Sequence, residues 1–252
     1  MKWRYYSSGA AALFAFGMFS AVAAVGVEGK VLMAGDSSMA AWRSADMYQG
    51  WGVPLSKYFA TDIKNFSGMS RSAAGFIEEG IWDELLLNVK EGDFVIISFG
   101  DSDENADNAV DQESVKTYIK DQKRLIADVM RRGAIPVIST MTPQGNVWTP
   151  DHKSIIPGSS YKFVDSARKS VAEFGGRVSI IDHYQFVAAA YQKLGYEKVA
   201  KLYLGGNGDS DSRTSKEGAE TIARAFLNAI RCTQHPLARA LNDQGKALEM
   251  EC

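Results

Sequence analysis

Five short apolar segments of the chain have the pattern of buried β-strands. They are Lys30–Ala34, Asp62–Asn65, Phe94–Ser98, Ile135–Ser139 and Val178–Ile181, of which Asp62–Asn65 is the least apolar. Most of them are rich in valine and isoleucine and show no alternation of polar and apolar residues. Strands that are covered on both faces of a sheet have this composition. We therefore expect a sheet that is buried between two layers.

Segments with a helical pattern separate these strands. The predicted helices are Val53–Phe59, Glu78–Val89, Val115–Arg132, Tyr161–Phe174, Tyr184–Leu194 and Ser215–Ile230. Gly133 provides a stop for the longest of them, and Ser215 is a plausible N-cap for the last. Because strands alternate with helices, the sequence predicts parallel βαβ units with helices on both faces of the sheet. The expected fold is α/β, a three-layer α/β/α sandwich with a five-stranded parallel sheet.

Residues 1–24 have the pattern of a secretory signal peptide. A basic start at Met1–Arg4 precedes an almost uncharged apolar run, and Ala21–Ala24 supplies small residues for cleavage. A membrane anchor is the weaker alternative, because a spanning helix needs about 20 apolar residues and Ala, Gly and Ser dilute this run. Residues 25–252 then form one domain, since no linker, repeat or shift in composition divides them. We expect a secreted, extracellular monomer with no membrane contact after cleavage.

The charge balance and the cysteines narrow the function. The chain has 28 Lys and Arg against 30 Asp and Glu, which gives no electrostatic reason to bind nucleic acid. Both cysteines, Cys232 and Cys252, follow the last predicted helix. In a secreted chain such a pair predicts a disulfide, which here ties the C-terminal tail to that helix. The spacing is not that of a zinc or redox motif, and we expect no metal and no other cofactor.

Candidate catalytic residues follow the first predicted strand. In parallel α/β sheets ligands bind beyond the carboxyl ends of the strands, and Gly35-Asp36-Ser37-Ser38 stands at such an end. The glycine permits a tight turn from strand to helix. Ser37 would then lie at a helix N-terminus, where backbone N–H groups favour developing negative charge. The sequence predicts Ser37 as a nucleophile, although such a turn can also be a simple helix cap.

Several motifs together resemble the SGNH, or GDSL-type, serine ester hydrolases, and among these the rhamnogalacturonan acetylesterases. Gly35–Ala40 resembles the block with the nucleophilic serine, and Asn65–Phe76 and Phe99–Asp103 resemble the second and third blocks. Asp182–Tyr184 and Thr214–Glu220 are similar to later segments of the family. The resemblance covers essentially all of residues 25–252. It implies a flavodoxin-like SGNH fold and hydrolysis of an acetylated polysaccharide or another small ester.

The resemblance also implies an oxyanion hole with three donors. In the family these are the amide of the nucleophile, a glycine amide in the second block and an asparagine side chain in the third. The glycine position falls on Ser70, or on Gly68 after a shift of two residues, and the asparagine position falls on Ser102. A serine keeps the backbone N–H, but the Ser102 hydroxyl is shorter than an asparagine amide. Loss of one such donor costs about 3 kcal/mol.

The chain departs most from the family at the general base. The family's last block has the pattern Asp-x-x-His, and here Ser210 and Arg213 stand at these positions, with Asp209 and Asp211 beside them. Arginine does not deprotonate in a protein, so Arg213 cannot act as a base. Loss of the base lowers turnover by about 10⁴- to 10⁶-fold. Arg213 either binds a uronate carboxylate or forms a salt bridge with Asp209 or Asp211, and the salt bridge is slightly favoured.

Other residues are candidates for a substitute base. His183 follows the last predicted strand, but family members carry a histidine there besides the catalytic one, which favours a packing role. His152, in the loop of residues 144–159, is a weaker candidate. Asp101 and Asp103 can also gather near the nucleophile with the aspartates beside Arg213. A hydrated carboxylate is a weak base unless burial raises its pKa, and solvated acidic loops are the simpler interpretation.

Two functions of different class remain open. The first is a carboxylic ester hydrolase, acetylesterase-like, with impaired catalysis because Arg213 replaces the histidine. The second is a catalytically inactive pseudoenzyme whose cleft binds a glycan or a protein partner.

Overall fold

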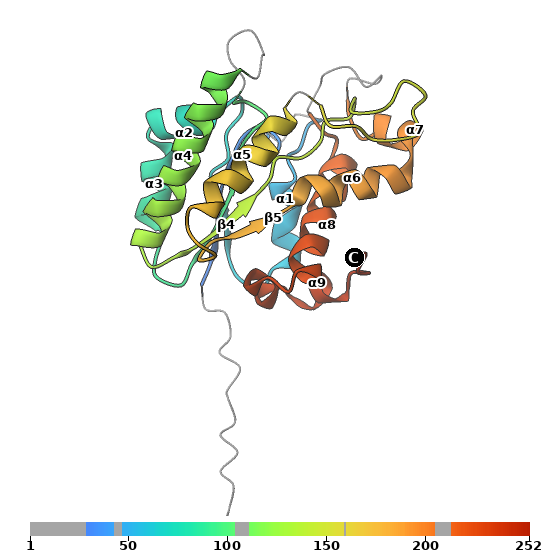
Figure 1. Cartoon of the computed structure of the whole chain (residues 1–252). Coiled ribbons are helices and arrows are strands. Elements are labelled where there is room, and N and C mark those ends of the chain that lie inside the picture. Colours follow the sequence, from blue (N-terminus) through green and yellow to red (C-terminus); the bar gives the residue numbers. More distant parts are fainter. Residues whose placement is uncertain (1–28, 43–46, 104–110, 159, 205–212) are drawn as a thin grey trace, which may run out of the picture.

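The computed structural model describes residues 29–42, 47–103, 111–158, 160–204 and 213–252. The predicted signal peptide, residues 1–24, lies outside the described residues, as do Asp209, Ser210 and Asp211. Within the described ranges, no helix is both long and apolar enough to cross a membrane. Figure 1 shows a single sheet with helices packed on both of its faces.

The strands of the described chain form one parallel sheet of five strands in the order β2-β1-β3-β4-β5. They are β1 (Val31–Gly35), β2 (Ile63–Asn65), β3 (Phe94–Ser98), β4 (Ile135–Ser139) and β5 (Ser179–Ile181). The predicted α/β sandwich is therefore confirmed, with every strand within one residue of its predicted start and end. The chain passes from β1 to β2 on one side and then to β3 on the other side of β1. Ligands of open α/β sheets bind at this kind of switch point.

Side chains of the central strands alternate between two apolar cores. Val31 and Met33 of β1 belong to one core, whereas Leu32 and Ala34 belong to the other, and β3 repeats this alternation. All four of these side chains are fully buried. Because both faces of the sheet are apolar, the strands carry no alternation of polar residues in the sequence.

Helices cover each face of the sheet (Figure 1). One core is covered by α2 (Ala73–Glu78), α3 (Ile81–Asn88), α4 (Gln112–Arg131) and α5 (Tyr161–Ala172). The opposite core is covered by α1 (Gly52–Leu55), α6 (His183–Leu194) and α8 (Lys216–Cys232). Shorter elements on this second side are η1 (Ser56–Tyr58), α7 (Tyr196–Ala200), η2 (Pro236–Ala240) and α9 (Asp243–Ala247).

The helix predicted over Glu78–Val89 is two helices in the structure. α2 ends at Glu78 and α3 begins at Ile81, and Gly80 lies between them with φ 76°. This left-handed conformation is one that glycine adopts at low cost, and it breaks the helix. α7 and α9, with 5 residues each, were not predicted, because such short helices show no periodic pattern.

The predicted disulfide between Cys232 and Cys252 is present. It joins the end of α8 to the last residue of the chain, 20 residues later. The Arg231 guanidinium adds hydrogen bonds to the carbonyl oxygens of Lys246 and Leu248. The C-terminal tail is therefore held against α8 by a covalent bond and by hydrogen bonds.

Candidate active site

Ser37 lies in the turn that leaves β1 at the switch point of the sheet. The Asp36 carboxylate shapes this turn, because its Oδ1 accepts hydrogen bonds from the Ser38 amide (3.0 Å) and hydroxyl (2.7 Å). Its Oδ2 accepts from the amide of Asp101, which follows β3 (3.0 Å). Asp36 therefore joins the carboxyl ends of β1 and β3 next to Ser37. The Ser37 residue itself is half-exposed.

The prediction that Ser37 begins a helix is wrong. Residues 37–39 form a turn, and the next helix among the described residues, α1, begins at Gly52. The Ser38 amide, which a helix would leave free to point outward, is instead bound by the Asp36 carboxylate. Donors for a negative charge at Ser37 must therefore come from other segments of the chain.

One such donor is the amide of Ser70, whose nitrogen lies 2.7 Å from the Ser37 Oγ. Gly68, the alternative donor, gives its own N–H to the Gly35 carbonyl oxygen (3.1 Å), which contradicts its assignment to the oxyanion hole. Ser70 has φ 53°, in the left-handed region that glycine adopts more readily than other residues. This angle explains physically why a glycine suits the position.

Ser102 comes to the same edge of the sheet from β3. It follows Asp101, whose amide binds Asp36, and it is half-buried. Gln144, from the loop after β4, donates its Nε2 hydrogen to Asp101 Oδ1 (3.2 Å). The loops after β1, β2, β3 and β4 thus supply Ser37, Ser70, Ser102 and Gln144 to one end of the sheet.

Two carboxyl groups at this edge are buried. Asp36 is 1% exposed and Asp103 is 9% exposed, so the expectation of a solvated loop is wrong for Asp103. Burial raises the pKa of Asp36 to about 7, and the nearby charge of Asp101 adds to the effect. Burial also raises the pKa of Asp103 to about 8. Asp103 Oδ1 accepts a hydrogen bond from the Ala73 amide at the start of α2 (2.9 Å).

His183 is part of the core, which confirms the packing role that the sequence favoured and contradicts the alternative of a substitute base. The imidazole is fully buried and meets the rings of Trp51 and Phe226 edge to face. Its Nε2 lies 2.9 Å from the Ile222 carbonyl oxygen and its Nδ1 lies 3.2 Å from the Ser139 Oγ. A carbonyl oxygen only accepts, so Nε2 carries the proton and donates it. Burial lowers the pKa of His183 to about 4.

His152 lies on the outer side of the loop after β4. Its exposed ring stacks on Tyr196 of α7, with ring centroids 3.6 Å apart. The Gln192 side chain of α6 fixes this part of the loop, because it accepts from the Ile155 amide (3.1 Å) and donates to the Lys153 carbonyl (2.6 Å). In the described part of the chain His152 therefore packs against α7, and it makes no hydrogen bond with Ser37.

Arg213 stacks on an aromatic ring, a contact that the sequence did not predict. Its guanidinium carbon lies 4.5 Å from the centroid of the Tyr48 ring, which lies 5.3 Å from the Trp42 ring. The next residue, Thr214, accepts from the Gln49 amide (2.9 Å) and donates its hydroxyl to the Gln49 carbonyl (2.7 Å). These contacts join the segment before α8 to the segment that follows Ser37. The aspartates predicted as salt-bridge partners lie outside the described residues.

Sequence reasoning assigned no role to Asp36, Gln144 or Tyr48. A signal for Asp36 was present, because an aspartate two residues before an amide commonly accepts its hydrogen bond in a turn. Gln144 and Tyr48 lie in loops, and their partners Asp101 and Arg213 are distant in the sequence. No local pattern could have paired them.

Comparisons of the sequence with known proteins find acetylesterases. No family model matches the chain. A rhamnogalacturonan acetylesterase from Emericella nidulans is 27% identical over 233 residues, covering 84% of this chain and 87% of that protein. The rhamnogalacturonan acetylesterase RhgT from Bacillus subtilis is 24% identical over 180 residues, covering 69% of this chain and 73% of that protein.

Solved structures show the same fold. The protein YxiM from Bacillus subtilis superposes with a TM-score of 0.73 at 20% identity, covering 82% of this chain and 57% of that one. Axe2, an acetylxylan esterase from Geobacillus stearothermophilus, superposes with a TM-score of 0.55 at 17% identity, covering 82% of this chain and 95% of that one. The chain is thus a homologue of rhamnogalacturonan acetylesterases, which are carboxylic ester hydrolases, and it has the fold of the GDSL-type, or SGNH, hydrolases.

Proposed function

We propose that this chain is a secreted serine ester hydrolase that removes acetyl groups from a pectin-like polysaccharide, with Ser37 as its nucleophile. The observation that carries the proposal is the 2.7 Å contact of the Ser70 amide with the Ser37 Oγ at the switch point. An amide donor at this position can hold an oxyanion beside the attacking atom. The relatives named rhamnogalacturonan acetylesterases support the substrate class. The disulfide supports an oxidising, extracellular compartment, and we expect a monomer there.

In the proposed reaction the Ser37 Oγ attacks the acetyl carbonyl carbon and loses its proton. The amides of Ser37 and Ser70 and the hydroxyl of Ser102 would hold the resulting oxyanion. Collapse of the tetrahedral intermediate breaks the ester bond, and the sugar oxygen leaves with a proton. Water then attacks the acetyl group on Ser37 and releases acetate, which restores the hydroxyl.

The acceptor for the Ser37 proton decides the rate of this reaction. Arg213 keeps its own proton, and His183 is enclosed in the core. Asp36 has a pKa near 7, but its two oxygens face the Ser38 and Asp101 donors. We therefore propose that turnover is slow, about 10⁴-fold or more below that of a serine hydrolase with a histidine base.

Arg213 also favours a second function, that of a pseudoenzyme which binds a glycan or a protein partner. Its guanidinium stacks on Tyr48, and Trp42 extends the aromatic surface. The guanidinium and the two rings provide contact area and a positive charge for binding. None of these three groups is a base that could accept the proton of a serine. This alternative predicts binding without any turnover that depends on Ser37.

Replacing Ser37 by alanine separates the two functions. We expect the chain of residues 25–252 to hydrolyse p-nitrophenyl acetate and acetylated pectin slowly, and Ser37→Ala to abolish this turnover because the attacking oxygen is gone. Ser154→Ala, which changes an exposed serine in the loop after β4, is the matched control and should leave the rate unchanged. Equal rates for Ser37→Ala and the unsubstituted chain would contradict the assignment of Ser37 as nucleophile. The binding function would then be the better explanation.

A further inference from the structure

Arg71 bonds to the peptide unit that supplies the amide donor for Ser37. This unit joins Met69 to Ser70, and its nitrogen lies 2.7 Å from the Ser37 Oγ. Its carbonyl oxygen, which belongs to Met69, accepts a hydrogen bond from the Arg71 Nη1 (2.6 Å). A trans peptide is planar and directs its N–H and C=O groups in opposite directions. A bond that fixes the carbonyl oxygen therefore also fixes the direction of the N–H group.

Glu79 holds the Arg71 side chain in this place. Its Oε2 accepts a hydrogen bond from the Arg71 Nε (2.7 Å) and lies 2.6 Å from the Arg71 Nη2. All three guanidinium nitrogens are thus bound, two of them to Glu79 and one to the Met69 carbonyl. Glu79 is the C-cap of α2, and its amide donates to the Gly75 carbonyl (3.0 Å). The guanidinium is therefore anchored at the far end of a helix, outside the loop that it holds.

The backbone of this loop depends on outside support. The stem of Arg71 packs against it, because a Cβ atom at Gly68 would lie 2.6 Å from the Arg71 Cδ. Ser70 has φ 53°, and an L-residue is less stable there than in the right-handed region. Rotation of the Met69–Ser70 peptide plane would relieve this angle and would turn the N–H group away from Ser37. The bond from Arg71 to the Met69 carbonyl opposes that rotation.

Solvent alone would not hold the peptide in this direction. Met69 and Ser70 are exposed, so water can bond to the carbonyl oxygen after a rotation as well as before it. The guanidinium favours one direction only, because Glu79 fixes its position. A cationic donor at the carbonyl oxygen also polarises the peptide, which makes the N–H group a stronger donor.

We propose that Arg71 is a positioning residue of the oxyanion hole. It holds the Met69–Ser70 peptide so that the N–H group stays directed at the Ser37 Oγ, beside which the oxyanion forms. The consequence for turnover rests on the proposed function, whereas the hold on the peptide does not. Because Arg71 acts through this peptide, we expect its loss to lower kcat and to leave KM unchanged.

Replacing Arg71 by alanine tests the effect on turnover of p-nitrophenyl acetate. After subtraction of the Ser37→Ala rate, kcat should fall about 10- to 100-fold, because a misdirected donor loses much of its stabilisation of the oxyanion. KM should stay within about twofold, since the donor acts in the transition state. Glu79→Gln keeps an acceptor oxygen for the guanidinium but not the charge, and it should lower kcat less than Arg71→Ala does.

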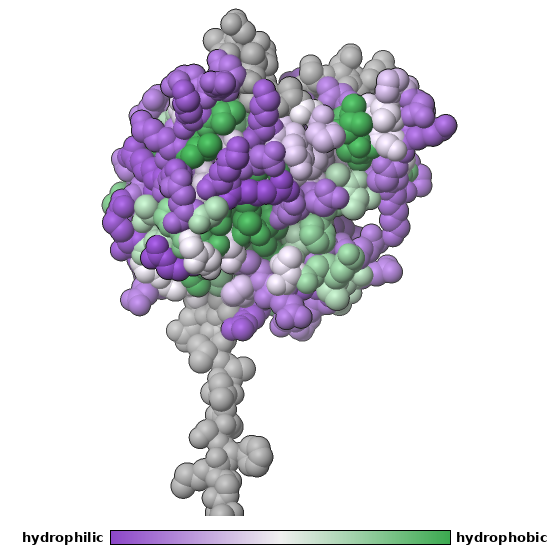
Figure 2. Space-filling view, viewed as in Figure 1, coloured by the Kyte–Doolittle hydropathy of each residue, from purple (hydrophilic) through white to green (hydrophobic). Residues whose placement is uncertain are grey.

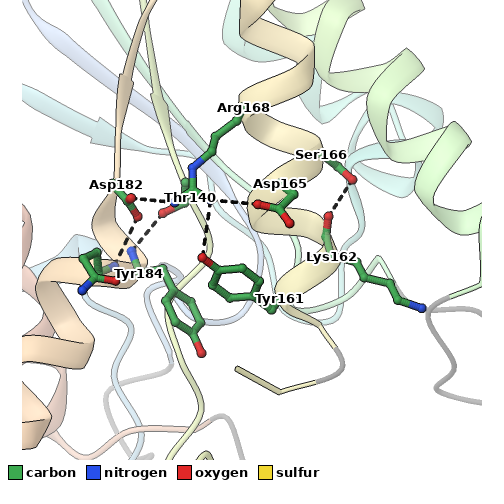
Figure 3. A network of polar contacts seen from close by, with 9 residues as sticks. Thr140, Tyr161, Lys162, Asp165, Ser166, Arg168, Asp182 and Tyr184 are labelled. Atoms are coloured by element: carbon green, nitrogen blue, oxygen red, sulfur yellow. Dashed lines mark hydrogen bonds and ion pairs between the residues drawn. The ribbon is translucent and has the colours of Figure 1, made fainter. Parts of the chain in front are cut away.

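Arg168→Ala is the matched control. Figure 3 shows the Arg168 guanidinium bound to Asp165, Asp182 and the Tyr161 hydroxyl, on α5 and at the start of α6. Its side chain is about as exposed as that of Arg71, at 38% against 33%. The substitution removes a comparable set of bonds outside the candidate site, so kcat should not change. An equal fall of kcat in both variants would overturn the proposal, because a general loss of stability would explain it.

Hydrogen exchange of the Ser70 amide, measured by NMR, tests the hold on the peptide without any turnover. We expect Arg71→Ala to speed this exchange about tenfold or more, as Ser37→Ala should by removing the acceptor, and Arg168→Ala to leave it unchanged. An unchanged exchange rate in Arg71→Ala would overturn the proposal, as would faster exchange with an unchanged kcat. Failure of the esterase function is detected separately, as equal turnover by Ser37→Ala and the unsubstituted chain. The exchange rates then decide alone whether Arg71 holds the peptide.

Discussion

The loop between β2 and α2 holds Ser70 at φ 53°, and this backbone angle accompanies the contact of its amide with the Ser37 oxygen. The side chain at position 70 takes no part in that contact. At position 213, by contrast, the side chain decides the chemistry. Arginine is not deprotonated in proteins, so Arg213 cannot take a proton from Ser37. In the structure its guanidinium stacks on Tyr48. The candidate site therefore keeps a donor for the oxyanion, and its residue 213 cannot serve as the base.

Restoring the family's residues in the last block should restore catalysis. We expect Arg213→His combined with Ser210→Asp to raise turnover of p-nitrophenyl acetate at least tenfold, since a positioned general base contributes roughly 10²- to 10⁴-fold. The gain should vanish when Ser37→Ala is added to the double variant. A correctly folded double variant with no gain would contradict the placement of the family's aspartate and histidine on positions 210 and 213.

Buried carboxyl groups join separate elements at the carboxyl edge of the sheet. Asp36 connects the ends of β1 and β3, and Asp103 connects the end of β3 to the first amide of α2. The Ser72 hydroxyl caps the same helix by accepting from the Gly75 amide (3.1 Å). The loop that contains Ser70 lies between β2 and this capped helix, so these contacts anchor the donor for Ser37 on the side of α2.

These carboxyl groups predict that the fold loses stability as the pH rises. Burial raises the pKa of Asp36 to about 7 and of Asp103 to about 8, from 3.8 in the unfolded chain. The native state therefore binds more protons than the unfolded state between these values. Each group lowers the free energy of unfolding by up to about 1.4 kcal/mol per pH unit across this window. His183, with its pKa lowered to about 4, acts in the opposite direction only below pH 6.5.

Urea unfolding between pH 6.5 and 8 checks this dependence without the contribution of His183. We expect the free energy of unfolding to fall over this interval, and Asp103→Asn to make the fall shallower because asparagine does not titrate. Asparagine keeps an oxygen that accepts from the Ala73 amide, so the link to α2 remains. Identical slopes for the two proteins would show that Asp103 does not titrate in this range.

At the scale of the whole molecule, the described residues bury most of their large apolar side chains in two cores. Figure 2 shows one face, on which apolar residues are gathered in separate patches among hydrophilic ones. The large apolar side chains that the described residues expose are scattered over several elements: Met47, Met69, Leu87, Ile135, Ile156 and Met250. Scattered exposure of this kind is normal for a protein without a permanent partner.

The disulfide stabilises this fold through its C-terminal tail. Opening the 20-residue loop with Cys232→Ser and Cys252→Ser is expected to lower the free energy of unfolding by about 3 kcal/mol, because the unfolded chain regains entropy. The measurement is urea unfolding of the variant and of the parent chain with and without a reducing agent. The reduced parent should match the variant. An unchanged midpoint in both would mean that the hydrogen bonds of Arg231 hold the tail by themselves.

The sequence by itself determined the α/β fold, because strands that are buried on both faces are uninterrupted apolar runs, and such runs can be recognised locally. It also placed Ser37 at the end of β1, since the motif directly follows such a run. Only the tertiary structure chose Ser70 over Gly68 as the amide donor, because the direction of an N–H group depends on the path of the whole loop. It alone gave His183 its buried partners and stacked Arg213 on an aromatic ring. Both results depend on residues that are distant along the chain and meet only when the sheet and its helices are assembled.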